Sequence, residues 1–550
     1  MLLPPDMRDW LPGDHPVWLV IAVVEDHLDT SAFHAGRRTG RAGAAGYDPD
    51  MMVALLVWAY ANRVTSSRRM ERLCQSDAAF GVICGGNRPD HVTIARFRSQ
   101  AGDAMAVLFA QVLGLCARLG MGKLGVVALD GMKMTANASK SANRSLARLT
   151  ELAAQAVAEH AAADAAEDEA YGAGQHGDEV PPDARSPQSR AGKKARDGRI
   201  ARALAELEAE RDAEEEAARE DQGAKAGRYR DRRAAGKRPG PVPASAQVQV
   251  AREEAERARA AQQAKIDDWN ARDAADRAAG GPGLSKRTRP KSPARDYVRV
   301  REAQARLDQA LERETARASR AEEERPRSRN ITDPDSRLMP VRDGGFRQAY
   351  NTQNVTSEDG LIIATQVTGT PGDVTWFEPM LSKALDAAGH IASRRPPASN
   401  AAASPGSTAA CQCGTCGTCL IGLFLADSGY LSEDNLTCPG PDRLIATGKH
   451  RDLEQNTRHP DSPKPSRYAG PATAAMAERL QTEEGITAYR QRGHIAETPH
   501  GNIKHNLGIR QFTLRGKTKV TAEWNLITAT HNLFKAITTG HLTTHALTTP

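Results

Sequence analysis

The pattern of apolar and polar positions divides the chain into regions of different character. From Asp48 to Met70, apolar residues recur at helical spacing, and residues 1–120 as a whole are predicted to be helical. A short apolar run, 124–129, then breaks this periodicity; it ends in Asp130-Gly131 and is followed by residues 132–137. This order predicts a buried strand, a turn and a second strand.

Residues 141–330 are rich in Ala, Arg and Glu, and their apolar residues keep a three-four spacing in several runs. Such spacing favours antiparallel helices or short coiled coils. Breaks rich in Gly and Pro separate the runs at 172–187, 236–243 and 280–293. Many inward positions are only Ala, so part of the segment is expected to be disordered. We predict an insertion without a catalytic role.

Strand patterns return after residue 331. The runs 348–355 and 361–368 flank a turn at 357–360, which predicts a hairpin. A helix is expected at 376–387, then a Cys-rich loop at 395–419 and an apolar strand, 420–426, that ends at Asp427. Helical regions at 477–507 and 520–537 close the pattern.

Composition narrows the class of protein. Aromatic residues make up 4% and charged residues 26%, which is too polar for a single core across 550 residues. The net charge of +6 suits a polyanionic partner. No apolar run approaches the roughly 20 residues of a membrane helix, and the first residues lack a signal-peptide pattern. We therefore expect a cytoplasmic protein with no membrane partner.

A short helix predicted at 91–100 carries Arg96 and Arg98 among apolar neighbours. Compact helical sets with an arginine-bearing short helix are typical of DNA-reading modules, so both arginines are candidate DNA contacts. The alternative is a helical bundle whose arginines are only solvated.

Two aspartates stand at the ends of predicted strands, and each is followed closely by a glycine: Asp130-Gly131 and Asp427-Ser428-Gly429. Cleavage of a phosphodiester by a two-metal route needs acidic oxygens that hold two divalent cations roughly 4 Å apart, and Mg²⁺ selects carboxylate oxygens. Rigid strand ends would hold such groups. An aspartate at a strand end is also a common turn residue.

Glu497 is the third candidate acid. It lies seven residues before Lys504, so two helical turns would place both on one face. Because proline is tolerated near the first turn of a helix, Pro499 predicts that Glu497 lies at a helix N-terminus. The alternative is an exposed amphipathic helix with an incidental acid.

Seven of the eight cysteines fall into two groups, and Cys438 stands alone. Cys74, Cys84 and Cys116 lie among apolar residues and are expected to be buried thiols. The spacing of a second group resembles a zinc or iron–sulfur ligand set, although an incidental thiol-rich loop is the alternative. Its members are Cys411, Cys413, Cys416 and Cys419.

Taken together, the motifs resemble the bacterial insertion-sequence transposases that use an Asp-Asp-Glu triad on an RNase-H-like fold. Four stretches carry the resemblance: 126–133; 332–337 with 349–353; 425–430; and 497–508 with its continuation to 535. The resemblance implies a mixed α/β sheet core and a metal-binding triad of Asp130, Asp427 and Glu497, with Mg²⁺ as the cofactor and Mn²⁺ as a substitute.

The resemblance also implies DNA contacts. Tyr489, Arg492 and Lys504 match the family signature that contacts the terminal phosphates of the element, with Arg490 as the alternative to Arg492 because the gap to Glu497 is one residue longer than the commonest form. Arg337 is a further candidate. The family often has an apolar run after its Glu, whereas this chain has 498-Thr-Pro-His-500.

The expected organisation is therefore a helical DNA-binding domain (1–120), a catalytic core in two parts (121–140 and 331–540) and a helical insertion (141–330). The implied activity is metal-dependent cleavage and strand transfer on double-stranded DNA, at the terminal inverted repeats and the target, by a nucleoid-associated homodimer. The alternatives are a decayed or repurposed DNA-binding copy, a structural coiled-coil protein, and a nuclease that cuts without joining. The insertion either grips a second DNA end or protomer or is merely tolerated.

Overall fold

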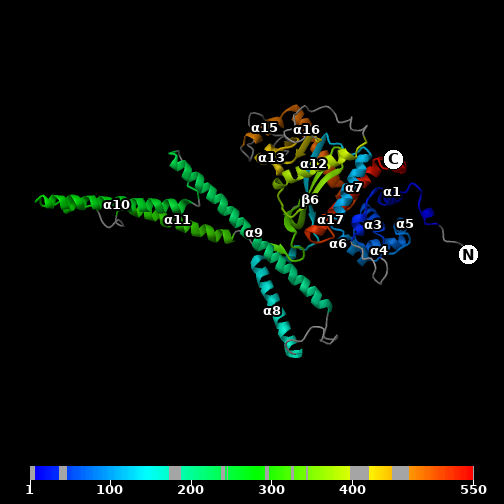
Figure 1. Cartoon of the computed structure of the whole chain (residues 1–550), viewed down its shortest axis with the longest axis horizontal. Helices are drawn as coiled ribbons and strands as arrows, with labels where there is room; N and C mark the ends of the chain where they lie inside the picture. Colours follow the sequence, from blue (N-terminus) through cyan, green and yellow to red (C-terminus); the bar gives the residue numbers. More distant parts are fainter. Residues whose placement is uncertain are drawn as a thin grey trace. The chain divides into compact units, whose positions relative to one another are not determined.

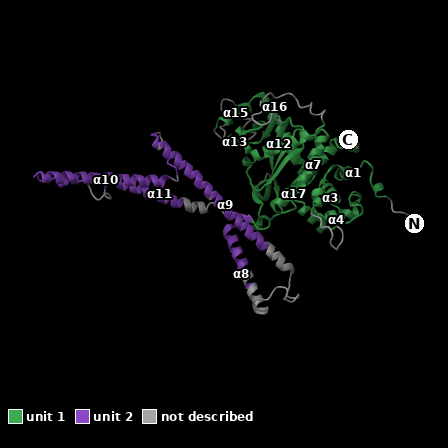
Figure 2. Cartoon of the chain, viewed as in Figure 1, with its two compact units in different colours: residues 1–143, 330–550 green, residues 144–329 purple. Residues whose placement is uncertain are grey.

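The computed structural model describes residues 6–35, 46–171, 187–236, 242–243, 246–290, 297–323, 328–341, 345–396, 420–448 and 470–548 (Figure 1). The chain divides into two compact units (Figure 2). The first combines Met1–Asn143 with Asn330–Pro550, and the second is Arg144–Arg329. Each unit is described by itself below.

A mixed sheet forms the centre of the first unit. Its strands are β1 (Val126–Thr135), β4 (Arg337–Pro340), β5 (Phe346–Ser357), β6 (Ile362–Thr368), β7 (Leu423–Ala426) and β8 (Asp442–Ile445). The order is β4-β5-β1-β7-β8, and β6 also pairs with β5. β5 runs antiparallel to β1, β4 and β6, whereas β7 runs parallel to β1 and β8. The β5–β6 hairpin predicted from the sequence is confirmed.

The turn predicted at Asp130-Gly131 is wrong. β1 continues without a break from Val126 to Thr135, because β5 supplies backbone partners along nearly its whole length, from Val127↔Ser357 to Thr135↔Ala349. β7 pairs only with the first half of β1, from Val126↔Leu423 to Leu129↔Ala426. The second half of β1 therefore has a neighbour on one side only among the described strands.

Helices cover the sheet and extend its core. α12 (Phe377–Arg394) packs on β5 and β6; α16 (Glu483–Gly501) packs on β1, β5 and β7; and α17 (Lys517–Thr538) packs on β6. The N-terminal helices contribute to the same hydrophobic core as the sheet, and α17 contacts α3, α6 and α7. The bounds of these N-terminal elements are η1 (Met7–Trp10), α1 (Pro16–Ala22), η2 (Val23–His27), α2 (Ser31–His34), α3 (Pro49–Ala61), α4 (Ser67–Ser76), α5 (Ala78–Ile83), α6 (His91–Gln100) and α7 (Ala104–Arg118).

Shorter elements complete the described chain. They are η3 (Lys140–Ala142), β2 (Asn143–Ser145), η6 (Lys286–Thr288), β3 (Ser328–Asn330), η8 (Val374–Trp376), η10 (Ser428–Tyr430), α13 (Glu433–Thr437), α15 (Pro471–Arg479), η11 (Asn502–Asn506) and α18 (Thr544–Thr548). β2 and β3 form a two-stranded sheet.

The second unit contains four long helices that pack as two pairs, α8 (Leu146–Tyr171) with α9 (Pro187–Ala234) and α10 (Gln247–Ala278) with α11 (Val298–Glu323). The α10–α11 pair is antiparallel, because Arg306 lies 3.7 Å from Glu254 and Arg259 donates to Gln304. Among the apolar residues with three-four spacing in this unit, Ile200, Leu207 and Val300 are buried, whereas Leu311 is exposed.

No single helix in the described ranges is long and apolar enough to cross a bilayer. α6 and α7, bent by 79° at their junction, meet the length and composition test only as a pair.

Candidate active site

The strand register brings the first two acids together. Leu129 on β1 is paired with Ala426 on the parallel strand β7, so Asp130 and Asp427 are the next residues on two neighbouring strands. β7 ends at Ala426, and Asp427 becomes the N-cap of η10, where its Oδ1 accepts a hydrogen bond from the Gly429 N–H at 2.8 Å. The two carboxylates therefore lie directly after the last backbone pair between β1 and β7.

Asp130 is buried, with 6% of the residue exposed. Its Oδ1 accepts hydrogen bonds from the Gly131 N–H at 3.0 Å and from Nη2 of Arg492 at 3.1 Å, and its Oδ2 lies 3.6 Å from Nδ1 of His500. Burial alone would raise the pKa of this carboxyl, but the hydrogen bond and charge of His500, together with Arg492, hold the pKa below its ordinary value. Asp130 is thus kept ionised.

Asp427 is in a different environment. Its side chain is 38% exposed, and its Oδ2 lies 3.5 Å from the same Nη2 of Arg492. Desolvation raises the pKa of Asp427, and the negative charges of Asp130 and Asp373 raise it further, while Arg492 partly offsets the rise. Negative charge is therefore in excess around Asp427, which is the electrostatic situation that a divalent cation relieves.

α16 supplies the groups that face the two aspartates. Its buried Ile495 and Ala496 join a small core cluster with Ala128, Leu425 and Leu444, and this packing fixes the helix against β1, β7 and β8. The same helix carries Tyr489, whose hydroxyl donates to the Ala426 carbonyl at 3.2 Å, and Arg492, which bridges the aspartates. Burial raises the pKa of Tyr489 to about 12.

The geometry distinguishes the two candidate arginines. Arg492 is largely buried and reaches both aspartates, whereas Arg490 on the same helix is exposed. Among the described residues, none forms a hydrogen bond with the buried Nε of Arg492. That N–H is therefore a buried donor without an acceptor.

The prediction that Glu497 begins a helix is wrong. α16 starts at Glu483, and both Glu497 and Pro499 lie in its last turns. Pro499 has no backbone N–H, so the helix lacks one backbone hydrogen bond at this position. Directly after Gly501 the helix changes into the π-helical turn η11, where the Leu507 N–H donates to the Asn502 carbonyl. Lys504 lies in this turn, so its separation from Glu497 is not two regular α-helical turns.

Glu497 is exposed at the rim of the site. It follows Arg492 by five residues and precedes His500 by three, and both of those residues contact Asp130. Desolvation lowers the pKa of Arg492, and the charges of Asp130, Tyr489, Asp427 and, after these, Glu497 raise it. Glu497 thus belongs to the helix segment that faces the aspartates, but no direct contact joins it to them.

Asp373 is a further acid at the site that the sequence analysis missed. It precedes η8, and its Oδ1 accepts hydrogen bonds from the side-chain amides of Asn351 at 2.6 Å and Gln353 at 2.7 Å. Its Oδ2 lies 3.8 Å from Nζ of Lys133. It stands in the loop between β6 and η8, and the only sequence signal for it was the polar pair Asn351 and Gln353 in β5.

The arginines predicted to bind DNA differ in exposure. Arg96 is exposed, but Arg98 is only 6% exposed and donates to the Tyr60 hydroxyl at 3.2 Å and to the Thr65 carbonyl at 2.7 Å. Tyr60 in turn donates to the buried Glu523 of α17 at 2.8 Å. Arg98 is therefore a structural link between helices, and we correct its assignment as a DNA contact: a buried guanidinium is out of reach of a phosphate.

Arg337 and Lys504 lie at the start of β4 and in the turn η11, respectively. Arg337 begins β4, and its Nη1 donates to the Pro334 carbonyl at 2.8 Å, closing the turn before the strand. Asp335, in the same turn, accepts from the Lys517 N–H at the start of α17 at 2.6 Å. Asp335 thus satisfies a backbone N–H in the first turn of that helix. Lys504 is half-buried in η11.

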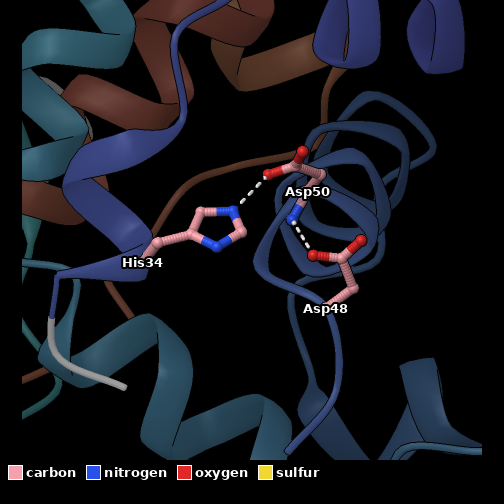
Figure 3. Close-up of side chains that lie close together, drawn as sticks. All are labelled: His34, Asp48 and Asp50. Carbon is pink, nitrogen blue, oxygen red and sulfur yellow. Dashed lines mark hydrogen bonds and ion pairs between the residues drawn. The ribbon is translucent and has the colours of Figure 1, made fainter. Parts of the chain in front are cut away.

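A second group of metal-ligand type lies among the N-terminal helices (Figure 3). Nε2 of His34 lies 2.9 Å from Oδ1 of Asp50, and Asp48 accepts from the Asp50 N–H at 3.4 Å as the N-cap of α3. Thr30 also donates to Asp50. These contacts are those of a capped helix start joined to a His–Asp pair, and they tie α2 to α3 without requiring an ion.

The cysteine predictions divide in two. Cys74, Cys84 and Cys116 are buried free thiols, as expected. The proposed ligand set at 411–419 lies outside the described residues.

Two family descriptions match the chain, and neither covers the two aspartates. "Transposase domain (DUF772)" matches residues 5–100, and "Transposase DDE domain" matches residues 460–537, the segment that carries Tyr489, Arg492 and Glu497. No curated protein and no solved structure matches. The mixed sheet, with the central order β6-β5-β1-β7-β8, is the fold that an RNase-H-like core requires. The two matched segments, together with this core, support an insertion-sequence transposase of the DDE type.

Proposed function

We propose that the chain cleaves DNA at the ends of its element and joins the freed 3′ ends to target DNA, with Asp130, Asp427 and Glu497 as the catalytic acids. The observation that carries the proposal is the pairing of Leu129 with Ala426, which sets Asp130 beside Asp427 under a helix that bears Glu497. The paired strands set two acids from distant parts of the chain side by side, and the helix that packs on these strands carries the third.

The residues present fit divalent cations. Asp130 is held ionised, Asp427 is partly exposed and surrounded by excess negative charge, and the sole cation bridging them among the described residues is Arg492. Carboxylate oxygens are the ligands that Mg²⁺ and Mn²⁺ prefer. When bound, two such ions would activate the attacking oxygen and stabilise the leaving oxygen.

The remaining side chains position the acids and the DNA. Tyr489 holds the backbone carbonyl just before Asp427, and its place one turn before Arg492 keeps that guanidinium over the site. We propose that Arg492 turns from the aspartates to a phosphate of the DNA when cations arrive, because its Nε already lacks an acceptor. Lys504 and Arg337 are proposed to contact the DNA backbone further out.

DNA binding is proposed to involve the N-terminal helices as well. Arg96 of α6 is exposed, and so are Arg68, Arg69 and Arg72 of α4. Phosphate contacts of this kind make binding sensitive to salt. Two element ends must be joined, so we propose that a homodimer is the working form.

The test is an in vitro reaction with the purified full chain, Mg²⁺, a DNA carrying both element ends, and a target plasmid. The proposal predicts cleavage at the ends and joined products from the wild type, and neither from Asp427→Asn. A matched control is Asp442→Asn, which removes an aspartate paired with Arg479 at the start of β8 and should leave joining intact.

The same reaction separates the alternatives. A decayed copy would bind the element ends without cutting them, and a nuclease would cut without joining. The departure at Thr498–His500 favours testing the first alternative, because His500 occupies a position next to Asp130. Binding without cleavage by the wild type, at saturating Mg²⁺, would contradict the proposed function.

A further inference from the structure

Asp373 lies on the opposite face of the sheet from Asp130. Side chains alternate between the two faces of a strand, and Asp130 is paired with Asn354, whose amide contacts His500. The neighbouring pairs are Gly131↔Gln353 and Lys133↔Asn351. Asp373 contacts Gln353, Asn351 and Lys133, whose side chains point to the face opposite Asp130. It therefore lies beside the same part of β1 as Asp130, but on the other face of the sheet.

The two glycines that follow the aspartates make room for Asp373. A Cβ placed on Gly131 would lie 2.8 Å from Oδ1 of Asp373, closer than real side chains approach. A Cβ on Gly429 would lie 3.3 Å from Oδ2 of Asp373 and 2.9 Å from Oδ1 of Asp427. The carboxylate of Asp373 is therefore packed against both backbone segments that carry the aspartates of the triad.

The charges of these groups are not balanced. Asp130, Asp427 and Asp373 form ion pairs with two permanent cations among the described residues, Arg492 and Lys133, and Lys133 is 3.8 Å away. The charge of Asp373 raises the pKa of Asp427 and also that of the buried Tyr430, whose hydroxyl donates to Gln353. Asp373 thus adds to the negative potential at the place where Asp427 is exposed.

We propose that Asp373 is a positioning residue of the metal site: held by two amides, it braces the turn of Asp427 and strengthens the attraction of the site for divalent cations. This inference rests on the proposed function. Asp373 acts through Asp427 and through the potential at the sheet edge, because its Oδ1 is already occupied by two amide donors.

The experiment measures Mn²⁺ binding to the full chain by electron paramagnetic resonance, together with the melting temperature of the metal-free protein. Asp373→Asn removes the charge while retaining the size of the side chain and an oxygen that can accept from the same amides. We expect its Mn²⁺ dissociation constant to rise about 3- to 10-fold, since one negative charge beside the turn of Asp427 is lost in a partly solvated place. Its metal-free melting temperature should not fall.

Asp359→Asn is the matched control. Asp359 is likewise hydrogen-bonded, accepting from Gly122 N, Lys123 N and Ser357 Oγ, but it lies at the β5–β6 turn. Its Mn²⁺ affinity should equal that of the wild type. Asp427→Asn is the positive control and should abolish the same site.

The outcomes separate the two ideas. If the wild type binds Mn²⁺, Asp427→Asn loses the ion and Asp373→Asn binds as the wild type does, the role of Asp373 is overturned while the proposed function stands. If Asp373→Asn binds less Mn²⁺ only because the metal-free protein has lost stability, Asp373 is merely structural and the inference is again overturned. If the wild type itself binds no Mn²⁺ that depends on Asp427, the proposed function fails first.

Discussion

Neutralising the two aspartates should change the stability of the metal-free protein in opposite directions. In Asp130→Asn, a buried carboxylate that accepts from Arg492 at 3.1 Å is replaced by an amide. Hydrogen bonds to charged groups contribute roughly 1.5–3 kcal/mol, so we expect a loss of about 2 kcal/mol. Folding raises the pKa of Asp427, so its ionised form is less favourable in the folded than in the unfolded protein. Asp427→Asn removes this carboxylate and should therefore increase the free energy of unfolding.

The gain in Asp427→Asn is smaller than the loss in Asp130→Asn. Both aspartates reach the same nitrogen of Arg492, at 3.1 Å and 3.5 Å, so their nearest oxygens are at most about 7 Å apart. At that separation two charges repel by roughly 0.6–2.4 kcal/mol for effective dielectric constants between 80 and 20. The side chain of Asp427 is 38% exposed, and Arg492 offsets part of the repulsion, so about 1 kcal/mol is expected.

The assay is thermal and chemical unfolding in the presence of a chelator, at several pH values. The ionised Asp130, with its lowered pKa, stabilises the fold fully above the unfolded pKa of about 4, and this contribution is lost as the pH falls through the lower folded value. The ionised Asp427, with its raised pKa, destabilises the fold above that value, and the penalty vanishes as the pH falls towards about 4. The advantage of Asp427→Asn should therefore be present at pH 7 and absent near pH 4. Equal losses of stability in the two variants at pH 7 would refute this electrostatic account of the site.

Three further outcomes follow from the contacts. Arg98→Ala should lower the melting temperature, because it removes a buried cation that contacts the Tyr60 hydroxyl; an unchanged melting temperature would count against its buried role. Arg96→Ala should leave the melting temperature unchanged and weaken binding to element-end DNA in a titration. Tyr489→Phe should cost about 1 kcal/mol and slow strand cleavage, because the Ala426 carbonyl loses its hydrogen bond; cleavage at the wild-type rate would show that this bond does not position Asp427. Mg²⁺ added to the metal-free wild type should raise its melting temperature, and chelation should reverse the rise; equal shifts in Asp427→Asn would place the ions elsewhere.

The core elements could be predicted from the sequence because their patterns are local. The apolar run before Asp130, the hairpin around 357–360 and the strand before Asp427 each depend on a few consecutive residues, and each is present in the structure. The turn expected at Asp130-Gly131 is absent, since a glycine in a strand can equally mark a close neighbour. Here that neighbour is Asp373, more than two hundred residues away in the chain.

The helix that bears Glu497 shows the same limit. Pro499 is a reliable sign of a helix boundary, but it does not say which boundary, and here it lies in the last turn, before a π-helical turn. Arg98 looked like a surface arginine because its helix is short and mixed; Tyr60, whose hydroxyl it contacts, and Glu523 beyond it come from distant segments. Long-range polar contacts of this kind leave no local pattern.

The central claim is that Glu497 completes the metal site of Asp130 and Asp427, although it lies exposed at the rim. The most direct measurement is the rate of Mg²⁺-dependent nicking of element-end DNA by Glu497→Gln, compared with Glu484→Gln, an exposed acid in the first turn of the same helix. The account predicts that Glu497→Gln binds the DNA but nicks it at least about 100-fold more slowly, while Glu484→Gln matches the wild type. Nicking by Glu497→Gln at the wild-type rate would contradict it.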